Sequence, residues 1–213
     1  MRKYFLHLCL TLSTFLLIGA TTAVNQQWFS VKWISDGDTI VLNGGRHVRY
    51  IGINAPEIAH DNHKAEPFGY EAKKYNQSLL RSQKVRLEFD KEKHDRYGRL
   101  LAYIFLSDGT FINKKMIEDG YAYVLHLRPN VKYDSVLLKT QRDAMSAKQG
   151  MWRNWNEQEG KKYVGSKRSK RFHLESCPYG KNIEKRNRLF FTRKWDAFWS
   201  GFAPCKRCLR GGD

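Results

Sequence analysis

Beyond residue 23, the 213-residue chain lacks any apolar run approaching the roughly 18–20 residues needed to span a membrane. An even set of cysteines is also missing, because Cys9 lies within the first 23 residues and leaves only Cys177, Cys205 and Cys208. An odd number argues against a framework built only of disulfides. Internal repeats and low-complexity tracts are absent as well. We therefore expect no stable membrane insertion and a chain long enough for one ordinary domain and a small additional module.

Acidic residues are scarce relative to basic ones. The sequence has 21 Asp and Glu against 38 Lys and Arg, which gives a formal net charge of +17 and a pI near 9.8. Such a balance is typical of proteins that bind polyanions. Charge alone does not distinguish nucleic acid from an anionic membrane or a cell-wall polymer, so the choice depends on whether the chain carries a matching site.

The first residues have the pattern of a targeting segment. Arg2 and Lys3 precede an apolar run from Tyr4 to Ala20, and small residues follow up to Ala23. This pattern predicts a secretory signal peptide over residues 1–23 and an exported protein, either secreted or periplasmic. An uncleaved N-terminal anchor is the alternative.

Short runs rich in β-branched and aromatic residues alternate with turn residues in the first part of the chain. These runs predict five strands, over residues Trp28–Ile34, Asp38–Leu42, His47–Ile53, Lys84–Phe89 and Arg99–Leu106. Apolar residues at helical spacing predict three helices, over residues Pro67–Ser82, Phe111–Asp119 and Ser135–Gln149. Five strands with about three helices suit a small closed barrel of the oligonucleotide/oligosaccharide-binding (OB) type, a mainly β fold with α-helices (α+β).

The composition changes after Trp155. Residues 157–213 hold fifteen Lys and Arg against six Asp and Glu, and they include every cysteine beyond residue 23. We therefore predict two domains after the signal peptide, a barrel over residues 24–156 and a small basic domain over residues 157–213.

Three clusters in the predicted barrel carry groups suited to phosphate chemistry. Residues 36–39 read Asp-Gly-Asp-Thr and place two carboxylates at the start of a strand, where they can bind a hard cation. Residues 49–57 place an arginine on a strand and an asparagine, a backbone carbonyl and a glutamate just beyond its end. Residues 95–99 read Asp-Arg-Tyr-Gly-Arg and form a turn before a strand. Each cluster alone is explained by an ordinary turn or a charged strand face. Together they supply a metal ligand, two guanidinium groups and a base, as phosphodiester hydrolysis requires.

The chain from about Trp28 to Trp155 resembles the staphylococcal nuclease (thermonuclease) family. The resemblance rests on Asp-Gly-Asp-Thr, on the arginine before the Pro-Glu pair at 56–57, on the turn at 95–99, and on Gly-Met-Trp at 150–152 after the last predicted helix. It implies a five-stranded barrel with three helices and the cleavage of DNA and RNA to products with 3′-phosphates.

The resemblance also implies roles for individual residues. Asp38, Asn54 and the backbone carbonyl of Ala55 would bind calcium, and Glu57 would be the general base that activates water. Arg49 and Arg99 would stabilise the transition state, since a guanidinium stays charged and matches two phosphate oxygens. Arg96 and Tyr97 would contact the substrate, although a turn-packing role for Tyr97 is equally open.

The sequence departs from the family at several positions. Asn54 stands where the family commonly has a second calcium-binding aspartate, which predicts weaker or altered metal preference, with Asp36 or water completing the shell. Residues 126–128 read His-Leu-Arg where well-known members place tyrosines against the nucleotide. The histidines at 60, 63 and 94 lack ligand spacing with a partner, so we interpret them as solvated.

The second domain carries a potential metal site. His173 and Cys177 are four residues apart, and Cys205-x2-Cys208 follows, so that one imidazole and three thiols form a tetrahedral set for structural zinc. A Cys205–Cys208 disulfide or redox pair is the alternative in an exported protein. The stretch from Tyr163 to Cys208 resembles the zinc-binding module of Ada-type DNA alkylation repair proteins. That family commonly uses four cysteines, so His173 is a departure.

These features predict an exported, calcium-dependent and zinc-containing nuclease that acts as a monomer on DNA and/or RNA with low sequence specificity. A nucleic-acid-binding module with little or no catalytic activity is the alternative. The presence of Arg49, Glu57 and Arg99 together favours the enzyme.

Overall fold

The computed structural model describes residues 26–60 and 64–209. The predicted signal peptide and the histidine at 63 lie outside these ranges. Within them, no helix has the length and apolar character required to cross a membrane.

The predicted five-stranded barrel is confirmed. Its strands close in the order β1-β2-β3-β6-β5, with β3 parallel to β6 and the other neighbours antiparallel. The strands are β1 (Trp28–Asp36), β2 (Thr39–Leu42), β3 (His47–Tyr50), β5 (Lys84–Glu88) and β6 (Leu100–Phe105). Residues that alternate along these strands, such as Ile40, Leu42, Val48 and Ile104, fill the barrel and are fully buried. Each such side chain contributes about 1.5–3 kcal/mol through its burial.

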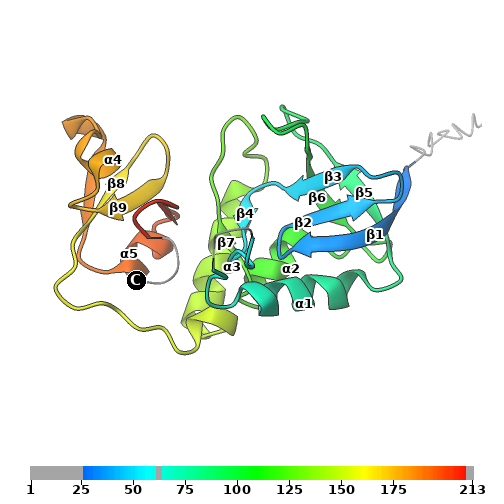
Figure 1. Cartoon of the computed structure of the whole chain (residues 1–213), viewed down its shortest axis with the longest axis horizontal. Helices are drawn as coiled ribbons and strands as arrows, with labels where there is room; N and C mark the ends of the chain where they lie inside the picture. Colours follow the sequence, from blue (N-terminus) through cyan, green and yellow to red (C-terminus); the bar gives the residue numbers. More distant parts are fainter. Residues whose placement is uncertain (1–25, 61–63, 210–213) are drawn as a thin grey trace, which may run out of the picture.

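Three helices cover the barrel, as the sequence predicts. They are α1 (Gly69–Leu80), α2 (Ile112–Glu118) and α3 (Asp134–Ser146). The buried residues Ala72, Asn76 and Leu80 are spaced four apart, so α1 presents one face to the barrel and packs on β1. Figure 1 shows α1 along one side of the barrel and α3 between the barrel and the C-terminal module.

The predicted strand over His47–Ile53 is wrong in its second half. The chain leaves the barrel after Tyr50, turns at Gly52 and resumes as β4 (Ile53–Asn54), which pairs with β7 (Tyr123–Val124). Gly52 has a positive φ of 79°, and a Cβ there would lie 2.5 Å from a Leu137 methyl group of α3. This glycine therefore breaks the strand and directs residues 53–57 across the end of the barrel.

The C-terminal module is a small sheet with short helices. Its strands β8 (Tyr163–Ser166), β9 (Arg171–Leu174), β10 (Arg188–Phe191) and β11 (Ala203–Pro204) lie in the order β10-β8-β9-β11. Helices α4 (Pro178–Lys181) and α5 (Lys194–Trp199) and the 3-10 turn η2 (Lys185–Asn187) complete it, and η1 (Gly150–Trp152) precedes it.

One apolar cluster joins the module to the barrel. Tyr123 and Trp152 of the barrel half pack with Phe172 and Phe198 of the module, and the Tyr123 and Phe198 ring centroids are 5.2 Å apart. The predicted boundary at 156/157 falls in the segment between η1 and β8. The aromatic packing across it fixes the module against the end of the barrel where residues 53–57 lie (Figure 1).

Candidate active site

The turn at 36–38 joins β1 to β2 and positions the first candidate ligand. The Asp38 N–H donates to Asp36 Oδ1 (2.9 Å), and the Ala55 N–H donates to Asp38 Oδ2 (2.7 Å). A Cβ at Gly37 would lie only 2.4 Å from the Cβ of Ala55. Glycine is therefore required for the Asp-Gly-Asp turn to approach the segment that carries Ala55.

Arg49 joins Asp38 to the segment that follows β3. Its Nη2 lies 2.8 Å from Asp38 Oδ2 and donates to Asn54 Oδ1 (3.1 Å). Its Nη1 donates to the carbonyls of Tyr50 (2.7 Å) and Ile53 (2.9 Å). Both terminal nitrogens thus bond to protein, and Arg49 holds the turn around Gly52 in place as well as neutralising Asp38.

Asn54 is 1% exposed and uses all of its amide. Its Nδ2 donates to the Ala55 carbonyl (2.8 Å) and to the Tyr123 hydroxyl (2.9 Å). The structure therefore brings Asp38, Arg49, Asn54 and Ala55 into direct contact. The link to Tyr123 of β7 was not foreseen, because the sequence gives no strand signal there.

Asp38 lies in an unusual electrostatic environment. Burial raises the pKa of its carboxyl to about 7, against the lowering effect of Arg49 and of the Ala55 N–H, and the nearby Asp36 and Glu57 raise it further. A bound cation would favour the ionised form. The adjacent oxygens of Asp38, Asn54 and Ala55 are hard donors of the kind that calcium takes, so the residues fit this ion, with one carboxylate in the set.

Glu57 lies beside this group, and its side chain is 21% exposed. One ligand atom each from Asp36, Glu57 and His60 lies within 4.8 Å of the others. His60 is exposed, as a solvated histidine should be, but its proximity to both carboxylates was not predicted. The Lys206 ammonium, from the C-terminal module, lies 2.5 Å from Glu57 Oε1, a contact that no pattern in the sequence indicates.

Arg96, Tyr97 and Arg99 form a separate cluster at the 95–99 turn. Arg99 Nε donates to Asp95 Oδ2 (2.7 Å), and the N–H groups of Tyr97 and Arg99 donate to Asp95 Oδ1. Burial raises the pKa of Asp95, but these bonds outweigh it and hold the pKa below its usual value. The Tyr97 ring is 67% exposed under the Arg96 guanidinium. Leu101 of β6 pairs with Arg49, and Arg99 precedes β6, two residues before that level.

The four predicted zinc ligands do come together. One ligand atom from each of His173, Cys177, Cys205 and Cys208 lies within 4.8 Å of the others, and all three thiols are free. Burial, with the nearby Arg171, lowers the pKa of His173, which favours the neutral imidazole that binds metal. Three thiols and a neutral imidazole in a compact group fit a structural zinc ion.

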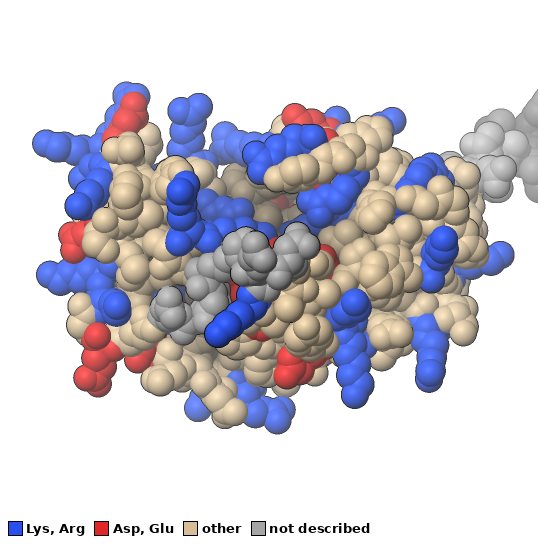
Figure 2. Space-filling model, viewed as in Figure 1, with Lys and Arg blue, Asp and Glu red and all other residues tan. Residues whose placement is uncertain are grey.

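Several hollows lie on the described part of the chain, and two of them bear on where the candidate site lies. A cavity of about 390 Å³ between the barrel and the module is lined by Pro56, Phe68, Tyr123, Trp155 and Lys206, among others, so it adjoins Glu57. On the face drawn in Figure 2, Lys and Arg side chains surround a hollow between the C-terminal module and the barrel.

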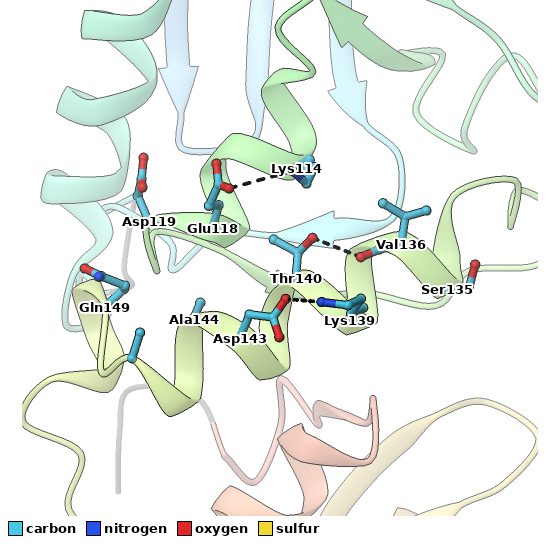
Figure 3. Close-up of a pocket in the computed structure, with 11 residues that line it drawn as sticks. Lys114, Glu118, Asp119, Ser135, Val136, Lys139, Thr140, Asp143, Ala144 and Gln149 are labelled. Carbon is cyan, nitrogen blue, oxygen red and sulfur yellow. Dashed lines mark hydrogen bonds and ion pairs between the residues drawn. The ribbon is translucent and has the colours of Figure 1, made fainter.

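A second hollow, of about 670 Å³, lies between α2 and α3 (Figure 3). Its charges pair with each other, as in Lys139–Asp143 (2.6 Å) and Lys114–Glu118 (3.7 Å), and it contains none of the candidate residues. The candidate active site is therefore the group at the end of the barrel and not this groove.

Fold and site together define a class, a small OB-type barrel with candidate cation ligands, the Arg49 guanidinium and a glutamate at one end. The chain belongs to the staphylococcal nuclease family, because the model of the family described as "Staphylococcal nuclease homologue" matches residues 47–154. The match contains every candidate barrel residue except Asp36 and Asp38 and ends before the C-terminal module.

Individual relatives agree with this assignment. The chain is 38% identical over 133 residues to the thermonuclease of Staphylococcus hyicus, covering 61% of this chain and 78% of that protein. It is 35% identical over 136 residues to the thermonuclease of Staphylococcus intermedius, covering 62% and 80%. It is also 38% identical over 122 residues to "Endonuclease YncB" of Bacillus subtilis (strain 168), covering 55% and 57%.

Proposed function

We propose that this protein is an exported nuclease that uses calcium to hydrolyse phosphodiester bonds in DNA and/or RNA with low sequence specificity. One observation carries the proposal: the Glu57 carboxylate lies with Asp36 and close to Asp38 at the end of the barrel where Arg49 also lies. A base, cation ligands and a guanidinium thus share one site in a chain of this family, whose relatives are named thermonuclease and endonuclease.

Each residue has a physical role in the proposed reaction. Glu57 accepts a proton from the attacking water. Arg49 and Arg99 donate to the phosphate oxygens as negative charge grows on them, and Arg96 and Tyr97 bind the flanking strand. Arg49 must exchange one of its present bonds for a phosphate oxygen when substrate binds, because both of its terminal nitrogens are occupied.

Metals complete the proposal. Calcium, held by Asp38, Asn54 and Ala55, would neutralise phosphate charge and polarise the scissile group. Zinc, held by His173 and the three thiols, would order the C-terminal module. The products proposed from the family resemblance carry 3′-phosphates, and the protein acts as a monomer after its signal peptide, residues 1–23, is removed.

The test is cleavage of labelled single- and double-stranded DNA and RNA with calcium, with magnesium or with a chelator. We expect calcium-dependent cleavage that falls about 10²–10⁴-fold in Glu57→Gln, because a positioned base contributes that much to the rate. Glu118→Gln is the matched control, since it makes the same change in the groove between α2 and α3. Binding without cleavage by the wild-type protein in every metal would establish the binding-module alternative instead.

A further inference from the structure

Lys206 connects the C-terminal module to the proposed base. Its Nζ lies 2.5 Å from Glu57 Oε1 although the two residues are 149 positions apart. Lys206 stands between Cys205 and Cys208, so the loop that carries two of the zinc-type ligands also reaches the end of the barrel. The family match covers residues 47–154, so it contains Glu57 but not Lys206.

The backbone on both sides of the contact is held in place. Strand β11 pairs with β9, and the Cys205 N–H donates to the Phe172 carbonyl (2.8 Å), which fixes the loop before Lys206. The Glu57 N–H donates to Glu66 Oε2 (3.1 Å), and the Glu66 N–H donates back to the Glu57 carbonyl (2.8 Å). The ion pair therefore joins two ordered segments, and its geometry is set by how the two parts of the chain pack.

Packing between the two parts is extensive enough to define that geometry. In addition to the shared aromatic cluster, Gln141 Nε2 of α3 donates to the Phe198 carbonyl (2.5 Å). Arg142 Nε donates to the Trp199 carbonyl (2.8 Å). These bonds tie the end of α5 to α3 of the barrel half, so contacts other than the Lys206–Glu57 pair also attach the module to the barrel.

Two cations near Lys206, Arg207 of the same loop and Arg171 of β9, are directed differently. The Arg207 guanidinium donates to the Tyr179 hydroxyl (2.5 Å) and lies over its ring, which keeps it within the module. Arg171 of β9 interacts electrostatically with Tyr123 and Arg49, and its Nη1 donates to the Pro204 carbonyl (3.0 Å). The module therefore directs Lys206 and Arg171 toward the candidate site and Arg207 away from it.

An ammonium group suits the task of holding a carboxylate. It is a compact charge whose three donors adapt to one oxygen, and the recorded contact is with Oε1. We propose that Lys206 is a positioning residue of the nuclease site, which fixes the Glu57 carboxylate for proton transfer and makes the two modules one catalytic unit. This inference rests on the proposed function, because Lys206 acts through Glu57.

The test uses the full chain and measures kcat and KM separately for calcium-dependent cleavage. We expect Lys206→Met and Lys206→Gln to lower kcat by about 10-fold or more with KM within about 3-fold, because positioning acts on the chemical step. Lys206→Arg, which restores a cation, should stay within about 3-fold of wild type in kcat. Arg207→Met makes the same change of charge on the same loop and should leave both constants within about 3-fold.

A double-mutant cycle with Glu57→Gln supplies the specific readout. If Lys206 acts through Glu57, then Lys206→Met should reduce single-turnover cleavage no further in the Glu57→Gln background. Zinc per chain is measured in every variant. Three results would each overturn the proposal. The first is a decrease in kcat that accompanies loss of zinc, and the second is an equal decrease in kcat in Lys206→Arg or Arg207→Met. The third is a double variant in which the two decreases in rate multiply.

Other outcomes separate the two proposals. Wild-type kcat in Lys206→Met, together with inactivity of Glu57→Gln, would overturn the role of Lys206 and leave the nuclease standing. A rise in kcat would also overturn it, since it would show that the contact blocks the base. Absence of cleavage by wild type in any metal would overturn both.

Discussion

Asn54→Asp tests the proposed calcium site directly. The buried amide donates to the Ala55 carbonyl (2.8 Å) and the Tyr123 hydroxyl (2.9 Å) and accepts from Arg49 (3.1 Å). Aspartate would remove both donors and place a second carboxylate beside Asp38. The change therefore exchanges hydrogen bonds that organise the site for charge that attracts a cation.

The magnitude follows from opposing terms. Unit charges 4 Å apart interact by about 4 kcal/mol at an effective dielectric constant of about 20, so a divalent cation gains about 8 kcal/mol. Loss of water from the cation and competition by Arg49 for the new carboxylate remove most of this gain. The two hydrogen bonds lost with the amide are missing with and without calcium, so they lower the stability and not the calcium affinity. The balance is about 2 kcal/mol, so we expect calcium to bind roughly 10–100-fold more tightly. Without calcium, the unsatisfied Ala55 carbonyl should cost about 1–3 kcal/mol of unfolding free energy.

Isothermal titration calorimetry measures the calcium affinity, and thermal unfolding with calcium or with a chelator measures the stability. Asn113→Asp is the control: Asn113 is fully buried, accepts from the Ile104 N–H (2.9 Å) and donates to the Ile51 carbonyl (2.8 Å). It should lose stability without any gain in calcium affinity. Equal or weaker calcium binding by Asn54→Asp would refute the assignment of this residue to the metal site.

Three further changes test other parts of the molecule. Phe172→Ala should destabilise the C-terminal module by about 3–5 kcal/mol, measured by chemical denaturation, because the fully buried Phe172 ring packs on Phe198. The control Phe190→Ala, which removes an exposed ring, should change the stability by less than about 0.5 kcal/mol. Cys177→Ser should abolish zinc binding measured by mass spectrometry. Unchanged zinc in this variant, or a disulfide between Cys205 and Cys208 in the native protein, would contradict the zinc site. Asp95→Asn should lose about 1–2 kcal/mol at neutral pH, because the native carboxylate accepts three hydrogen bonds. The pKa of Asp95 is lower in the folded than in the unfolded protein, so its ionised carboxylate stabilises the folded protein above the unfolded pKa of about 4. This stabilisation is lost as the pH falls through the lower folded pKa, so the free energies of unfolding of the native protein and of Asp95→Asn should become equal in acid.

Much of the fold followed from local pattern. Strand alternation and helical spacing placed the barrel strands and the three helices to within a few residues, because each element must bury one face. The strand over His47–Ile53 failed at Gly52, where the need for a positive φ and the approach of Leu137 outweighed β-propensity. Strand β7 was not predicted because a strand of two residues is too short to show alternation of apolar and polar residues. Its pairing with β4 depends on the turn at Gly52.

The sequence by itself determined the residue types of the site and their order along the chain, because metal, phosphate and proton chemistry each demand particular groups. It also determined the zinc-type set, whose spacing is local at both ends. Only the tertiary structure decided that Arg49 binds Asp38 and Asn54, that His60 approaches Asp36 and Glu57, and that Lys206 reaches Glu57. The contacts at the end of the barrel depend on the turn at Gly52 and on the approach of the 36–38 turn. Packing between the barrel and the module sets the distance between Lys206 and Glu57, which are 149 positions apart, and no short pattern encodes either arrangement.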